Sequence, residues 1–191
     1  MIELIQIQLP PAQGFKEACQ ITILTPSSEK DLIRSIQNKQ SLNIVQGGLL
    51  NREILEQKQV DVLVAPEFGR EKEFLHHRNS GLNHVLCQLA HKNNITIAFD
   101  ISSLLHKKGR YRSLILGQMR QNVMLCRKYK VRMLLSMFAR SEWDQRSSFE
   151  LEEFGILLGM TLKEAKQAVS SAEFILKDKK EFIRHGLREI N

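Results

Sequence analysis

Apolar residues occur along this chain in short runs that are separated by amphipathic stretches. The runs at residues 62–65 and 95–99 are almost uninterrupted. Strands that are buried on both faces show this pattern, which favours a parallel sheet covered by helices. The runs predict six strands, at residues 2–9, 20–25, 42–46, 60–65, 95–99 and 133–137.

Helical periodicity fills the intervals between the predicted strands. Leu82, Val85, Leu86 and Leu89 recur at the i, i+3, i+4, i+7 spacing of a helix that buries one face. The longest pattern, at residues 111–129, combines an apolar stripe with a basic flank. Polar capping signals open a helix near residues 27–31 and another at residue 161. Further helices are predicted at residues 51–58, 151–160 and 162–170.

The alternation of strands and helices predicts an α/β fold, either a TIM-barrel-like (β/α) barrel or a doubly wound sheet. An eight-fold barrel usually needs about 250 residues. Because this chain has 191 residues, we expect a barrel that is incomplete or irregular at its N-terminus. We expect one domain over residues 1–177 and a charged, flexible tail over residues 178–191.

Positive charge is concentrated in the second half of the chain. Residues 1–100 have a net charge of −1 and residues 101–191 a net charge of +8, which together give +7. The stretch at residues 101–141 contains no Asp or Glu. It holds ten bases: Lys107, Lys108, Arg110, Arg112, Arg120, Arg127, Lys128, Lys130, Arg132 and Arg140. Such a field attracts polyanions such as RNA or DNA, or acidic proteins. The alternative is a solvated surface whose compensating acids lie nearby in space.

Composition narrows the class of protein further. Aromatic residues make up 6% of the chain, which argues against a single-strand binder that stacks bases on a sheet. The three cysteines form no CxxC pair, which disfavours a disulfide framework or a zinc ribbon and suits a reducing compartment. The N-terminus shows no secretion-signal pattern, and no apolar run approaches membrane-spanning length. We therefore expect a soluble, cytoplasmic protein that does not associate with a membrane.

Motifs for catalysis are weak. No HxH, HExxH or comparable cluster supports a metal site, and no GxSxG elbow or P-loop is present. We therefore assign no catalytic residue, no metal ligand and no cofactor bound by this chain. The serine pairs at residues 102–103 and 147–148 fit helix caps. Glu67 and Asp100 follow predicted strands, where barrel enzymes place acids, but capping the next helix suits Asp100 better.

The basic residues gather at turns, where side chains can reach phosphates. One cluster spans residues 107–112, a second spans residues 127–132, and Arg140 and Arg146 follow the last predicted strand. Asp144 could hold Arg146 in a fixed orientation, or form a simple local ion pair with it. Trp143 is the only tryptophan, and we expect it to fill a gap in the core rather than to stack on a base.

Five segments in order along the chain resemble archaeal ribonuclease P protein component 3 and the wider family of the thirty-kilodalton ribonuclease P subunit. They are GLNHVL at residues 81–86, KNNITIAF at 92–99, YKVR at 129–132, WDQR at 143–146 and GILLGM at 155–160. The resemblance extends to EFILK at residues 173–177 and covers roughly residues 60–177. It implies a TIM-barrel-like fold related to the PHP metal-phosphoesterases.

The resemblance also implies a function. It suggests a subunit of the ribonucleoprotein endonuclease that removes the 5′ leader from precursor tRNA, in which the RNA performs hydrolysis with Mg²⁺. The implied partners are ribonuclease P RNA, precursor tRNA, a small ferredoxin-like protein subunit in a two-plus-two heterotetramer, and the other ribonuclease P proteins. Two departures stand out: few residues precede the strand predicted at residue 20, and Met137-Phe138-Ala139 replaces the family's serine-rich turn.

The leading hypothesis is a non-catalytic scaffold whose cations neutralise RNA phosphates. Its expected RNA-binding residues are Lys107, Lys108, Arg110, Arg112, Lys130, Arg132, Arg140, Arg146 and His84. His84 would lie at a helix start and contact a phosphate or a partner, although a surface histidine without such a role fits equally well. The alternatives are a PHP-like metal-dependent phosphoesterase and a barrel that binds only another protein.

Overall fold

The computed structural model describes residues 1–6, 10–36, 42–70 and 78–188, with side chains placed as far as residue 178. The strands are β1 (Ile2–Ile5), β2 (Glu17–Gln20), β3 (Ile23–Leu24), β4 (Ile44–Gln46), β5 (Val62–Val64), β6 (Thr96–Asp100) and β7 (Met133–Ser136). The helices are α1 (Glu29–Ser35), α2 (Asn51–Glu56), α3 (His84–Lys92), α4 (Ile101–Leu105), α5 (Gly109–Lys128), α6 (Ser148–Leu157) and α7 (Leu162–Arg188), with a 3₁₀ turn, η1, at Glu142–Asp144.

Parallel pairing of the strands forms a small ring. Strands β3-β4-β5-β6-β7 make one parallel sheet, and β1 and β2 pair in parallel separately. A parallel bridge between Ile5 and Ala139 joins β1 to the chain just beyond β7, and the Gln6 N–H donates to the Ala139 carbonyl at 2.9 Å. Only Ile21 and the residue after it separate β2 from β3, so the pairing returns to its starting point. The predicted barrel-like class is confirmed, with its irregular part at the N-terminal strands.

The sequence-based strands agree with the structure except near the N-terminus. Strands β3, β4, β5 and β7 lie within predicted runs, and β6 extends one residue beyond the run predicted at residues 95–99. The run predicted at residues 2–9 contains β1, and residues 7–9 lie outside the described part of the chain. Strand β2 was not predicted, because Glu17-Ala18-Cys19-Gln20 lacks an apolar pattern of its own. It is held as a strand by its backbone pairing with β1.

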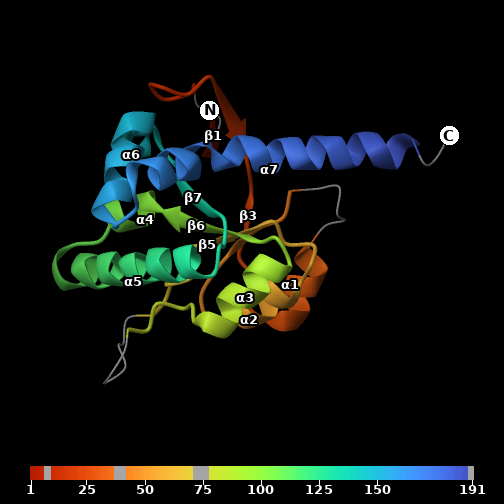
Figure 1. The fold of residues 1–191 in the computed structure, drawn as a ribbon, viewed down its shortest axis with the longest axis horizontal. Helices are drawn as coiled ribbons and strands as arrows, with labels where there is room; N and C mark the ends of the chain where they lie inside the picture. The colour runs from red at the N-terminus through yellow and green to blue at the C-terminus, as the bar shows by residue number, and fades with distance from the viewer. Residues whose placement is uncertain (7–9, 37–41, 71–77, 189–191) are drawn as a thin grey trace.

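Two apolar layers explain the uninterrupted strand patterns. Alternate strand residues such as Val62, Val64 and Ala98 pack together inside the ring, whereas Leu63 and Ile97 pack outward against the helices. This two-sided burial is the arrangement expected for parallel strands covered by helices. In Figure 1, α1, α2 and α3 lie together on one side of the strands, and α6 lies with the first half of α7 on another.

Helix α7 is much longer than predicted. It continues from Leu162 to Arg188, where the apolar pattern had indicated an end near residue 170. Its first turns bury Ala165 and Val169 in the outer layer, and Ala172 and Ile175 then join the inner layer at the start of the strands. Figure 1 shows the remainder projecting past the strands. The expectation that residues 178–191 form a separate tail stays a prediction.

Capping side chains fix most helix starts. Ser28 caps α1, and Thr161 and Glu164 form the predicted reciprocal pair at α7, with the Thr161 N–H to Glu164 Oε2 distance at 2.7 Å. Asp100 caps α4 as expected, and the two serines that follow it donate to it rather than acting as caps. At α6 the N-cap is Ser147, and Ser148 is the first residue of the helix. Among the described helices, even the longest lacks an apolar stretch of the length a bilayer requires.

A buried amide connects the loops at the end where the strands finish, which we call the barrel mouth. Asn51 accepts from the Gly48 N–H at 2.7 Å and donates to the Pro66 and Gly81 carbonyls at 2.7 and 2.9 Å. Gly81 has φ +81°, and a Cβ there would collide with the Pro66 carbonyl. The loop after β4 and both ends of the connection between β5 and α3 therefore meet at one side chain.

We predict that Asn51→Leu destabilises the protein by about 2–4 kcal/mol, because it leaves buried backbone groups without partners. Urea unfolding measures this change. Arg52→Ala is the matched control, since Arg52 is the next residue on α2, is exposed, and makes only a surface ion pair with Glu56; its cost should stay below about 1 kcal/mol. Equal stabilities for the two variants would show that the amide does not hold the loops.

Candidate nucleic-acid interface

Six of the predicted RNA-binding residues lie at the barrel mouth. Lys107 and Lys108 lie in the turn between α4 and α5, and Arg110 and Arg112 lie in the first turn of α5. Arg140 follows β7, and Arg146 follows η1. Because all the strands are parallel, loops that are far apart in sequence meet at this end. The side chains of Lys107, Lys108 and Arg110 are exposed and make no hydrogen bond or ion pair with the residues that the structure describes. Their charges face solvent at the mouth.

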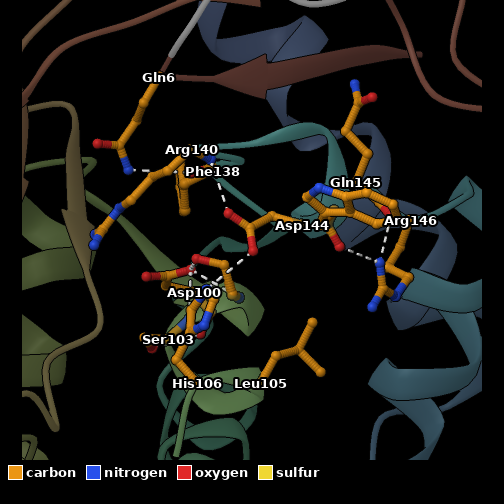
Figure 2. Close-up of polar contacts among 12 residues, drawn as sticks. Gln6, Asp100, Ser103, Leu105, His106, Phe138, Arg140, Asp144, Gln145 and Arg146 are labelled. Carbon is orange, nitrogen blue, oxygen red and sulfur yellow. Dashed lines mark hydrogen bonds and ion pairs between the residues drawn. The ribbon is translucent and has the colours of Figure 1, made fainter.

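Two of the mouth arginines help to build the surface. The Arg112 guanidinium donates to the Lys107 carbonyl at 2.8 Å and to the Leu105 carbonyl at 3.1 Å, which holds the turn that presents the lysines. The Arg146 guanidinium donates to the Trp143 and Gln145 carbonyls at 2.9 and 2.6 Å. The prediction that Asp144 holds Arg146 is therefore wrong: backbone carbonyls hold it, as Figure 2 shows.

Asp144 instead links two mouth loops (Figure 2). Its carboxylate accepts from the Arg140 N–H at 3.2 Å and contacts His106 Nε2 at 3.0 Å. Burial alone would raise the pKa of Asp144, but the Arg140 N–H, Ser141 and His106 outweigh burial and lower it. The carboxylate stays charged and ties the chain after β7 to helix α4. The contact of His106 with Asp144 was not predicted, because the two residues lie 38 positions apart in the sequence.

The remaining predicted residues lie elsewhere. Lys130 and Arg132 precede β7, at the end of the barrel opposite the mouth, and Arg132 lies 3.5 Å from Asp178. His84 is the first residue of α3, and it lines a groove between α3 and α5 together with Arg78 and Lys128. The group predicted from sequence is therefore divided among three surfaces.

Part of the acid-free stretch is neutralised by acids from elsewhere in the chain. The Arg127 guanidinium makes two contacts of 2.7 Å with the Glu164 carboxylate and also donates to the Gly159 carbonyl. The hydrogen bond from Arg127 lowers the pKa of Glu164 to about 2. Arg127 thus fastens α5 to the start of α7. The alternative that acids nearby in space neutralise the basic stretch is therefore correct for Arg127. The side chains of Lys107, Lys108 and Arg110 at the mouth make no such ion pair with the described residues.

The only tryptophan is exposed at the mouth. Trp143 is 87% exposed in the η1 turn, so the prediction that it fills the core is wrong. The turn is held by the buried Asp144 next to it, and this leaves the indole in solvent. Phe149, at the start of α6, is also mostly exposed. Aromatic faces therefore accompany the positive charge here.

Glu67 is buried at the mouth without a cation that neutralises it among the described residues. Its side chain is 3% exposed, and Oε2 accepts from the Asn122 amide at 3.1 Å. Burial raises the pKa of Glu67 from 4.5 to about 8, against the opposing hydrogen bond from Asn122 and with a contribution from Asp100. The described residues form no group of three His, Cys, Asp or Glu that could hold a metal ion.

We predict that Glu67 makes the free energy of unfolding depend on pH. Between pH 4.5 and about 8 the unfolded chain releases this proton and the folded chain keeps it, so the free energy of unfolding falls with rising pH. The contribution is up to about 1.4 kcal/mol per pH unit. Glu67→Gln removes it, so the variant should gain stability relative to the unmodified protein from pH 5 to 8. Urea unfolding at several pH values tests this. The control is Glu153→Gln, at an exposed position; parallel curves for Glu67→Gln would refute the assignment.

Comparisons with known proteins agree with this geometry. The family model described as RNase P subunit p30 matches residues 16–182. The chain is 34% identical to ribonuclease P protein component 3 of Methanosarcina acetivorans over 85% of its own length and 66% of the relative. It is 36% identical to the protein of the same name from Methanococcoides burtonii, over 81% of this chain and 62% of the relative. It therefore spans slightly less than two thirds of these relatives.

A solved structure shares the fold. A chain in the cryo-EM structure of archaeal ribonuclease P with mature tRNA superimposes with a TM-score of 0.78, covering 96% of this chain and 93% of that one at 22% identity. The family model covers most of the barrel, including every loop of the mouth described above. The chain belongs to the family of the ribonuclease P subunit p30.

Proposed function

We propose that this chain is a protein subunit of ribonuclease P, the ribonucleoprotein that removes the 5′ leader from precursor tRNA. In this proposal the chain binds and stabilises the RNA, and the RNA, with Mg²⁺, performs the hydrolysis. The observation that carries the proposal is the set of exposed, unpaired cations that parallel strands bring to the barrel mouth of a p30-family protein.

The contacts expected at the mouth are electrostatic. Lys107, Lys108 and Arg110 would neutralise phosphates, which releases counterions and makes RNA affinity depend on salt. Arg112 and Arg146 would act mainly by holding the loops, since their guanidinium groups already donate to carbonyls. Arg140, exposed beside the last strand, adds a further cation at the mouth. Lys130, Arg132 and His84 would contact RNA only if it also reached other faces of the barrel.

The partners follow from the family resemblance. We propose ribonuclease P RNA as the direct ligand and precursor tRNA as the substrate of the assembled complex. We also propose a small ferredoxin-like subunit, in a two-plus-two heterotetramer, together with the other ribonuclease P proteins. A role in tRNA maturation would place the chain in the cytoplasm.

Removal of mouth charge should weaken RNA binding specifically. We expect Lys107→Ala/Lys108→Ala/Arg110→Ala to reduce the slope of log affinity against log salt by about 2 to 3, since each phosphate contact contributes about 0.7–0.9. The matched control is Lys30→Ala/Lys163→Ala/Lys166→Ala, which removes the same charge from exposed positions elsewhere. Filter binding to ribonuclease P RNA gives the slopes.

Reconstituted precursor-tRNA cleavage tests the activity itself. The RNA with the other subunits should cleave faster when this chain is added, and the mouth variant should lose most of that stimulation while the control variant keeps it. Two results would overturn the proposal. One is cleavage at the mature 5′ end by the chain alone; the other is phosphatase turnover with stoichiometric bound zinc or manganese, which would favour the phosphoesterase alternative.

Trp143 provides a direct signal for the position of the RNA. Because it is the only tryptophan and is exposed at the mouth, the free protein should emit at the wavelength of a solvated indole. RNA binding at the mouth should quench or shift this emission in step with binding. Unchanged fluorescence at saturating RNA would place the RNA on another face.

A further inference from the structure

A small cavity opens beside the basic turn at the barrel mouth. It has a volume of about 120 Å³ and lies between the loop after β5 and the first turns of α5. Glu67 and Arg70 contribute polar groups, and Leu114 and Ile115 contribute an apolar wall. Lys107 and Tyr111 also line it, and Tyr111 is 51% exposed.

Two of the buried polar atoms on residues that line this cavity lack partners among the described residues. They are Oε1 of Glu67 and Nε of Arg70. The other groups of both side chains are occupied: Glu67 Oε2 accepts from Asn122, and the two terminal nitrogens of Arg70 donate to Asn79 at 2.9 Å and to the Gly48 carbonyl at 2.8 Å. Buried polar atoms are rarely left unpaired, because each costs about 1–3 kcal/mol.

The protonation of Glu67 decides what these atoms can bind. With its pKa raised to about 8 by burial, the Glu67 carboxyl is mostly neutral at pH 7 and carries an O–H. The Arg70 Nε–H is a donor at any pH. Two donors on residues that line the cavity therefore lack acceptors, which suits a ligand that carries carbonyl oxygens.

The volume favours a ligand with one ring. An apolar cavity of about 150 Å³ in another protein accommodates benzene. The cavity here, of about 120 Å³ and open on one side, is of similar size and suits one six-membered ring better than the two fused rings of a purine. Lys107 at its edge, with Lys108 and Arg110 close by in sequence, is positioned to neutralise phosphates that flank such a ring.

We propose that this cavity binds one unstacked pyrimidine base of the RNA, with uracil as the preferred base because it presents two carbonyl oxygens. The proposal rests on the proposed RNA-binding function and gives it a site. Glu67 and Arg70 would donate to the base carbonyls, and Leu114 and Ile115 would contact the ring. Tyr111 would lie beside the base or its ribose, and Lys107 would contact the adjacent phosphate.

Free nucleosides test the pocket without the rest of the ribonucleoprotein. Uridine added to the full chain should shift the methyl NMR signals of Leu114 and Ile115 and saturate with a Kd on the order of 1 mM. Adenosine should bind at least about tenfold more weakly, since its second ring does not fit. Equal binding of uridine and adenosine, no saturation with uridine, or equal displacement of uridine by inorganic phosphate would overturn the proposal.

A matched pair of variants locates the binding. Leu114→Trp fills the cavity and should abolish the uridine shifts, read on Ile115. Met124→Trp adds the same ring to the exposed side of α5 and should leave them unchanged. Ile115→Phe is a second filling variant in case the first fails to fold, as judged by circular dichroism. Uridine binding that survives in a folded, filled variant would refute the site.

A crosslinking experiment on the assembled ribonucleoprotein is the last test. Ribonuclease P RNA substituted with 4-thiouridine should crosslink within residues 103–118, and Leu114→Trp should remove that crosslink. If the chain stimulates precursor-tRNA cleavage but uridine does not bind or this crosslink is missing, the pocket proposal fails alone. If the nucleoside binds but the chain neither stimulates cleavage nor crosslinks to RNA, the ribonuclease P assignment and the RNA ligand fail together.

Discussion

The barrel depends on one seam, where the first strand pairs with the chain that leaves the last. The Gln6 N–H donates to the Ala139 carbonyl at 2.9 Å, and the Gln6 side-chain amide donates to the Phe138 carbonyl at 3.1 Å. Without this pairing, β1 and β7 would both be open edges of parallel sheets, with unpaired backbone groups. The seam also fixes the next residue, Arg140, at the mouth. The same few hydrogen bonds therefore close the barrel and place Arg140 at its mouth.

The mouth shows how a barrel can concentrate charge and still be stable. Its exposed lysines make no contact with acids of the described chain, whereas its carboxylates serve the scaffold: Asp100 caps α4 and Asp144 joins two loops. Asp100 and Asp144 are buried, whereas the side chains of Lys107, Lys108 and Arg110 lie at the surface. This arrangement leaves the positive field available to a polyanion.

Much of the fold could be read from the sequence because local patterns and tertiary structure agree. Apolar runs located β3 to β7, and Thr161 with Glu164 marked the start of α7. The failures have physical causes. Strand β2 exists only through its pairing with β1, and Arg146 is held by backbone carbonyls rather than by the nearest acid.

The candidate site was harder to predict than the fold. Charge identified the Lys107–Arg112 turn, but charge alone could not separate Arg127, which is neutralised by Glu164, from the bases of the mouth. The prediction that Trp143 is buried was wrong because it relied on the average burial of tryptophan. In this protein the buried Asp144 next to it anchors the η1 turn, and Trp143 is left exposed. The cavity beside Glu67 depends on side chains from distant segments, and no local pattern records it.

The seam has a consequence for how the molecule is made. Gln6 and the Phe138 carbonyl are 132 residues apart, so β1 leaves the ribosome long before its second neighbour exists. Closing so long a loop carries an entropic cost and belongs to a late step of folding. Until then β1 and β2 remain a two-stranded ribbon, which is marginal on its own in water. The pairing of β1 is therefore completed by a segment that is synthesised much later.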